Sequence, residues 1–244
     1  MNSGERARRR AGEQFGPVRW ARARLALVFW LLVTFVLLGI AAHRTVAFEL
    51  DVRFTRWVQG LDWRPLRWAT DFTNWAMSGM PLTIGAIAVV VLLLLQGWRV
   101  DAVMLAVVIA IRLLNSGLKA VIESPRPTPD LVKVSEHSQT FGFPSGHASG
   151  ALLVIGAIAW IITRRVASPA WRVAVWVIAA CWISLTGFGR IYVGAHWPSD
   201  VLGGWLWSAA ALVLIAWGIE VVRSRQVAHS EGRIGEWQTG RGGF

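Results

Sequence analysis

The chain has 244 residues, of which 55% are apolar and only 16% are charged, and its formal net charge is +11. A soluble domain of this length carries a more polar surface, so the composition indicates a membrane protein. Most of the positive charge lies beside apolar segments, which favours contact with anionic lipid and argues against nucleic acid as a partner.

Six apolar segments approach or reach the roughly 20 residues that a helix needs to cross a bilayer. They are predicted near residues 25–42, 81–97, 101–118, 148–163, 171–188 and 201–222. We expect the first to be an uncleaved anchor and not a signal peptide, because it is long and its basic leader is extended. The fourth is short, which suggests a tilted or partly buried span. The predicted fold class is therefore all-α, a polytopic bundle of six transmembrane helices.

One membrane domain, residues 25–222, accounts for these spans. A basic tail, residues 1–24, precedes it. The tail at 223–244 is polar and rich in glycine, so we expect it to be disordered.

Positively charged residues predict the topology. Fifteen of the 25 Lys and Arg residues fall in the two tails and in the loops after the second and fourth spans. The positive-inside rule then places both termini in the cytoplasm. The loops at 43–80, 119–147 and 189–200 face the other side of the membrane.

The loop at 43–80 carries apolar residues at helical spacing. They are Leu50, Phe54, Trp57, Val58 and Leu61. This pattern predicts one or two interfacial helices on the outer leaflet, and the alternative is a loop that only packs over the bundle.

Two of the outward loops carry the polar residues of a phosphoryl-transfer site. Lys119, Arg126 and Arg190 lie at span ends on one face of the membrane. Two guanidinium forks and one ammonium suit the equatorial oxygens of a phosphate, whose charge spreads in the transition state. Ser145 and Gly146 open the fourth span, where free backbone N–H groups bind anions.

The same loops supply a nucleophile and an acid. Pro198 suits the first turn of the sixth span, which places His196 just before it and Asp200 within it. The carboxylate then fixes the tautomer of His196 and leaves its other ring nitrogen free to attack phosphorus. His147 is available to protonate the leaving oxygen. With three cations present, we expect neither a metal nor a cofactor, and the single cysteine, Cys181, excludes cysteine-rich zinc sites.

These motifs resemble those of the type 2 phosphatidic acid phosphatases, whose fold is shared with the vanadium haloperoxidases. The family pattern is Lys-x6-Arg-Pro, Pro-Ser-Gly-His and Ser-Arg-x5-His-x3-Asp, and it matches Lys119–Pro127, Pro144–His147 and Arg190–Asp200 in order. The resemblance covers roughly residues 80–222. It implies a bacterial plasma-membrane lipid phosphatase that forms a phosphohistidine at His196.

Two residues stand apart from this pattern. Gly189 replaces the serine expected before Arg190, and we expect a backbone N–H to substitute for the lost hydroxyl. Arg112 lies within a span, two turns before Lys119, and either pairs with another helix or acts near the substrate.

Several functions remain open. The leading hypothesis is hydrolysis of a lipid phosphate, with an isoprenyl diphosphate, phosphatidic acid or phosphatidylglycerol phosphate as the substrate. A lipid phosphotransferase would use the same intermediate, and a non-catalytic lipid-binding or transport protein would keep only the fold. Haloperoxidases are soluble, which disfavours that activity for a six-span chain. The sequence predicts no oligomeric state.

Overall fold

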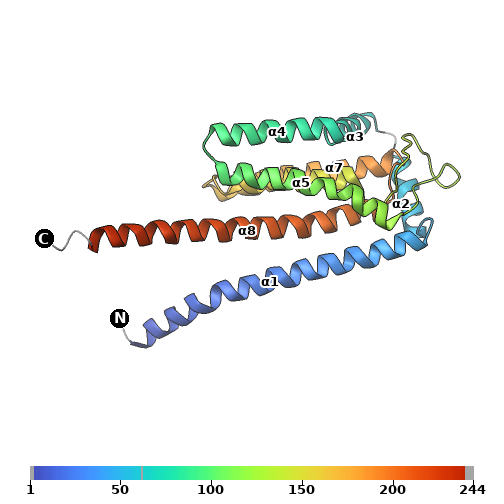
Figure 1. Ribbon diagram of the computed structural model, residues 1–244. Helices are drawn as coiled ribbons and strands as arrows, with labels where there is room; N and C mark the ends of the chain where they lie inside the picture. The colour runs from blue at the N-terminus through green and yellow to red at the C-terminus, as the bar shows by residue number, and fades with distance from the viewer. Residues whose placement is uncertain (1–2, 62, 240–244) are drawn as a thin grey trace.

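The computed structural model describes residues 3–61 and 63–239, and this part of the chain is all-helical, without a β-strand (Figure 1). The helices are α1 (Ser3–Arg44), α2 (Glu49–Gln59), α3 (Arg64–Ala76), α4 (Gly79–Leu95), α5 (Arg99–Ile122), α6 (Gly146–Thr163), α7 (Pro169–Tyr192) and α8 (Pro198–Thr239).

Most of these helices have the length and composition of membrane spans. Five helical segments in the described residues qualify, within α1, α5, α6, α7 and α8. Helices α3 and α4 are bent by 67° at a short break and form a sixth candidate when they are counted as one span. The predicted all-α membrane bundle is confirmed, with its second span preceded by the bent helix α3.

Helix α6 is the centre of the bundle. It packs against α5, α7 and α8, and 61% of its apolar window is buried, compared with 17% for α5. The short fourth span is therefore shielded by protein, as its length suggested. Around it, α1 packs along α8, α4 packs on α5, and α3 packs against α7.

Two glycines let α8 approach the start of α6. A side chain at Gly203 would meet the ring of Phe143 at 2.2 Å, and one at Gly204 would meet the backbone oxygen of Ser145 at 2.9 Å. This glycine pair therefore allows close packing, which fixes the loop that precedes α6 on the first turns of α8.

The loop at 43–80 forms the two helices α2 and α3. Helix α2 lies at the end of the bundle far from the chain termini (Figure 1). It exposes Leu50 and Trp57 and buries Asp51, Thr55 and Val58 against the bundle. The predicted apolar face is confirmed for Leu50, Phe54 and Trp57, which are exposed, whereas Val58 is fully buried.

The chain ends differ from the prediction. Helix α8 continues to Thr239, so residues 223–239 have helical backbone where a disordered tail was expected. A helix that is already nucleated in the span extends easily through the Arg, Gln, Ala and Glu residues that follow. Residues 240–244 of that tail lie outside the described part of the chain. The N-terminal end of α1 and the C-terminal end of α8 lie at the same end of the bundle (Figure 1).

Candidate active site

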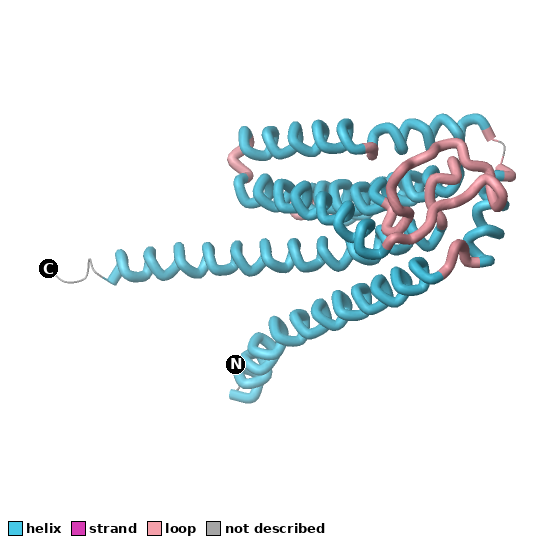
Figure 2. The backbone as a smooth tube through the Cα atoms, turned by 45° about the vertical axis from the view of Figure 1, so that its right-hand side comes forward, coloured by secondary structure: helices cyan, strands magenta, loops and turns pink. Residues whose placement is uncertain are grey.

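The predicted site residues come from the segments at the end of the bundle opposite the chain termini, where the long loops gather (Figure 2). They are Lys119 at the end of α5, Arg126 in the following loop, Ser145, Gly146 and His147 at the start of α6, Arg190 at the end of α7, His196 in the next loop and Asp200 in the first turn of α8. Six segments thus contribute to one region, because helix ends meet there.

His196 and Asp200 form a buried pair. Nδ1 of His196 lies 3.1 Å from Oδ2 of Asp200, and the same oxygen accepts the backbone N–H of Trp197 at 3.0 Å. On the other side of the ring, Nε2 lies 3.4 Å from Nη1 of Arg126. A proton on Nδ1 that is donated to the carboxylate leaves the lone pair on Nε2, facing a cation.

The surroundings of His196 keep its imidazole neutral. Burial lowers the pKa of His196 well below its ordinary value of 6.5, and neighbouring positive charges lower it further. In decreasing order of effect, the cationic neighbours are Lys119, Arg126 and Arg190. All three predicted cations therefore lie close enough to the ring to disfavour its protonation.

Two of the cations are held by backbone carbonyls. Arg126 donates from Nε to the oxygen of Thr140 and from Nη1 to that of Ala195, both at 2.6 Å, and so it joins the two loops of the site. Lys119 donates from Nζ to the oxygens of Phe141 and Gly142, at 2.6 and 2.9 Å. A carbonyl carries no net charge, so these partners do not neutralise either side chain.

Arg190 differs, because it is already paired with a carboxylate. Its two terminal nitrogens donate to the two oxygens of Glu136 at 2.7 and 2.8 Å. The hydrogen bonds from Arg190 lower the pKa of Glu136, so the pair is ionised. We did not predict Glu136 from the sequence. It lies between two motifs at no family spacing, and only the geometry identifies it.

The start of α6 is fixed by polar contacts from three directions. Ser145 is the N-cap, and its backbone N–H donates to the backbone oxygen of Asp200 at 2.9 Å. Asn115 of α5 donates to the oxygen of Pro144 at 3.3 Å and accepts the hydroxyl of Ser149 at 3.0 Å. Trp207 of α8 donates to the same hydroxyl at 2.9 Å. Gly146 and His147 remain half-buried and so open to a ligand.

Helix α2 contributes a carboxylate that the sequence did not reveal as part of the site. Asp51 accepts the backbone N–H of Ser199 at 3.0 Å and its hydroxyl at 2.5 Å. A carboxylate at a helix N-terminus satisfies free donors and favours the helix dipole. Burial raises the pKa of Asp51, and the two bonds from Ser199 oppose that rise. Asp51 therefore anchors α2 to the turn that carries Asp200.

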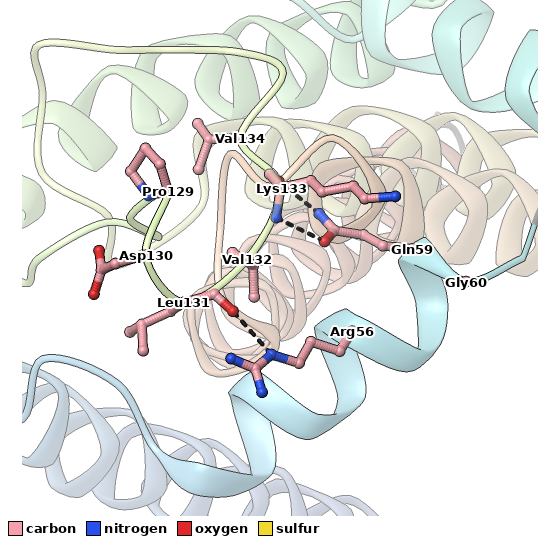
Figure 3. Close-up of a pocket in the computed structure, with 9 residues that line it drawn as sticks. All are labelled: Arg56, Gln59, Gly60, Pro129, Asp130, Leu131, Val132, Lys133 and Val134. Carbon is pink, nitrogen blue, oxygen red and sulfur yellow. Dashed lines mark hydrogen bonds between the residues drawn. The ribbon is translucent and has the colours of Figure 1, made fainter.

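The same helix holds the loop that follows α5 (Figure 3). Arg56 donates from Nε to the oxygen of Leu131 at 2.9 Å. Gln59 donates to the oxygen of Lys133 at 2.7 Å and accepts its N–H at 3.0 Å. These bonds border a pocket of about 400 Å³ between α2 and the loop. The loop that supplies Arg126 and Glu136 is thus clamped along its outer side.

Gly189 has a packing role that the sequence did not reveal. It lies inside α7, and a side chain there would meet Asn74 at 3.0 Å and Thr70 at 3.1 Å, both on α3. The N–H of Gly189 itself lies within the helical hydrogen-bond ladder, so the backbone N–H expected to replace the missing hydroxyl stays a prediction for another position. The glycine instead admits the close packing of α3.

Arg112 joins two helices. It donates to the hydroxyl of Thr83 at 3.2 Å and to the oxygen of Gly79 at 3.4 Å, both at the start of α4. These contacts favour the helix-pairing role among the two that the sequence left open.

Comparison with known proteins gives the same picture. The model of the PAP2 superfamily matches residues 101–223. Phosphatidylglycerophosphatase B of Bacillus subtilis is 38% identical over 94 residues, which cover 38% of this chain and 45% of that protein. An undecaprenyl-diphosphatase of Sulfolobus acidocaldarius is 38% identical over 66 residues, 27% of this chain and 28% of that protein. These matches span less than half the length of the curated relatives.

Solved structures agree over a longer stretch. A crystal structure of a transmembrane PAP2-type phosphatidylglycerolphosphate phosphatase from Bacillus subtilis superposes with a TM-score of 0.71 at 25% identity. It covers 80% of this chain and 96% of that one. The crystal structure of LpxE from Aquifex aeolicus gives 0.55 at 22% identity, over 68% and 96% of the two chains, and supports the fold alone.

Proposed function

The chain belongs to the PAP2 superfamily, and we propose that it is an integral membrane phosphatase that hydrolyses a phosphate or diphosphate lipid through a phosphohistidine on His196. The observation that carries the proposal is the environment of this ring. Asp200 holds Nδ1, and Nε2 faces Arg126 at 3.4 Å, so the reactive nitrogen points to a cation that can bind the phosphate.

The reaction proceeds in two displacements. Nε2 of His196 attacks phosphorus, the bond to the lipid oxygen breaks, and His147 donates a proton to that oxygen. Water then attacks phosphorus and gives a proton to the imidazole of His147, while the N–P bond to His196 breaks and inorganic phosphate is released. Asp200 stabilises the positive charge that develops on His196 in the first step.

The phosphate oxygens are bound by Lys119, Arg126 and Arg190 and by the N-terminus of α6 at Ser145 and Gly146. Preorganised donors of this kind stabilise the charge of the transition state without a bound metal or cofactor. The substrate must displace Glu136 from Arg190, because both anions use the same guanidinium fork. Relatives are named for phosphatidylglycerophosphate and undecaprenyl diphosphate, and both are candidate substrates here.

The site faces the extracytoplasmic side in this proposal. Both chain ends lie at the opposite end of the bundle, with most of the Lys and Arg residues that flank the spans. The positive-inside rule assigns that end to the cytoplasm. A reporter protein that is active only in the cytoplasm should therefore be active when it is fused to either terminus.

Phosphate release from purified protein tests the function. The substrates are a panel of isoprenyl diphosphates and glycerolipid phosphates, each with and without EDTA. We expect EDTA-resistant release that His196→Ala lowers by about 10⁴-fold or more. His137→Ala is the matched control, because His137 is exposed in the loop before α6. Full activity in His196→Ala would reject the mechanism. Transfer of phosphate to an added alcohol, with no release, would indicate a phosphotransferase.

A further inference from the structure

An apolar groove opens between α1 and α5 beside the candidate site. Its volume is about 490 Å³, within the range of pockets that bind small ligands. Val36 and Ile40 line it from α1, and Leu118 and Val121 line it from α5. Val121 is 80% exposed and Val36 is 52% exposed, so the groove opens to the surface that the bilayer covers.

The inner wall of this groove is continuous with the loop that precedes α6. The ring of Phe35 lies 5.3 Å from that of Phe143, and a side chain at Gly39 would meet Phe143 at 3.3 Å. Phe143 directly precedes the Pro144–His147 motif. On the other wall, Leu118 directly precedes Lys119, whose ammonium bonds to the carbonyl of Gly142. The groove therefore ends where the phosphate-binding residues begin.

The end of the groove formed by the last residues of α1 and α5 carries polar groups. Nδ1 of His43 bonds to the backbone oxygen of Ile122 at 2.8 Å, which ties the two helices together at the rim. Arg44 follows as an exposed cation that also lines the groove. An apolar channel beneath a cationic rim complements an anionic amphiphile.

The dimensions of the groove select one occupant. Its α5 wall spans only residues 118–122, about one helical turn. A helix of another protein or a second copy of the chain would need a stripe of several turns to pack stably. A single hydrocarbon chain needs no such stripe.

We propose that the groove between α1 and α5 binds the hydrocarbon tail of the substrate and thereby positions its phosphate beside Lys119. This inference rests on the proposed phosphatase function. In a bilayer the tail gains little from leaving other lipid chains, so the groove acts by orientation and not by hydrophobic transfer.

Filling the groove from its exposed wall tests the proposal. Val121→Trp places an indole across the opening, away from the catalytic residues. Leu114→Trp is the matched control, because Leu114 lies two turns earlier on the same face of α5, is 60% exposed and lies outside the groove. Each variant is assayed with dioleoyl phosphatidic acid in mixed micelles and with a water-soluble dibutyryl analogue.

We expect Val121→Trp to lower kcat/KM for the long-chain substrate by about tenfold, mainly through KM, and to leave the short-chain substrate within about twofold. Leu114→Trp should change neither. Ile40→Trp fills the groove from α1 and should reproduce the result, which guards against misfolding of one variant. Equal effects on both substrates, or an equal loss in Leu114→Trp, would overturn the proposal. Wild-type protein that releases no phosphate from these two lipids or from any member of the panel of isoprenyl diphosphates and glycerolipid phosphates would instead reject the proposed function, and this inference with it.

Discussion

The two ends of the bundle use charge in opposite ways. At the end with the chain termini, Asp101 is buried and pairs with both Arg165 and Arg223, and Arg24 pairs with Glu220 at 2.6 Å. The guanidinium of Arg165 also lies 3.7 Å from the centre of the Trp98 ring. Each of these contacts links helices or loops that are far apart in the sequence.

The opposite end of the bundle holds the candidate site and is called the catalytic end. Two of its three site cations have no carboxylate partner of this kind among the described residues. Lys119 and Arg126 donate to carbonyls. One carboxylate oxygen of Asp200 lies beside Nδ1 of His196, and the other has no hydrogen-bond partner among the described residues. Of the three site cations, Arg190 is the one paired with a carboxylate among the described residues, the half-exposed Glu136. The ion pairs at one end link distant segments, whereas Lys119 and Arg126 at the other end have carbonyl partners, as the proposed binding of a phosphate requires.

The largest test exchanges one carboxylate at each end for its amide. Asp200→Asn should lower kcat by about 10³- to 10⁴-fold, because an amide that donates to Nδ1 moves the imidazole proton to Nε2 and removes the nucleophile. Asp101→Asn should leave kcat nearly unchanged but destabilise the protein by about 3 kcal/mol, since two arginines lose a buried partner.

Phosphate release and the melting temperature in detergent, measured on both variants, give the readout. The comparison fails if Asp101→Asn loses as much activity as Asp200→Asn while its melting temperature is unchanged.

The next test removes a catalytic-end cation and follows the pH profile. Because burial and cations lower the pKa of His196, the ring stays neutral below pH 6.5, and kcat/KM should fall only at more acidic pH. Arg126→Gln should lower kcat/KM by about 10²-fold and shift this acidic limb to higher pH, since a positive charge that lowers the pKa is lost.

Arg56→Gln is the matched control for that shift. Arg56 also donates to a carbonyl of the α5–α6 loop, yet it is not among the charges that most lower the pKa of His196. A loop-holding role for Arg126 would make the two variants alike, with no movement of the acidic limb in either.

The sequence predicted the parts of the molecule that repeat a pattern. Span composition yields the helices, and motif spacing yields His147, His196, Asp200 and the three cations. These residues sit at helix ends, so topology alone brings them to one end of the bundle. Their predicted roles as catalytic and phosphate-binding groups await the experiments above.

The contacts across the loops could not be predicted in the same way. Asp51 precedes Ser199 by 148 residues, and Glu136 precedes Arg190 by 54, so no local spacing connects either pair. The packing role of Gly189 was hidden from the sequence for the same reason. The sequence shows that a hydroxyl is missing there but not that α3 packs against that face of α7.

The smallest expected effect concerns Glu136, the one carboxylate that makes the catalytic end resemble the other. Its two oxygens occupy the fork of Arg190 as two phosphate oxygens would, so it competes with substrate and product. Glu136→Gln should lower the inhibition constant of inorganic phosphate by about two- to fivefold, the range expected when a partly exposed ion pair is removed. Glu123→Gln, an exposed glutamate at the end of α5, is the matched control and should change nothing. An inhibition constant that rises in Glu136→Gln would mean that the glutamate orients Arg190 for phosphate. The Arg190–Glu136 pair would then have a structural role, like the ion pairs at the opposite end.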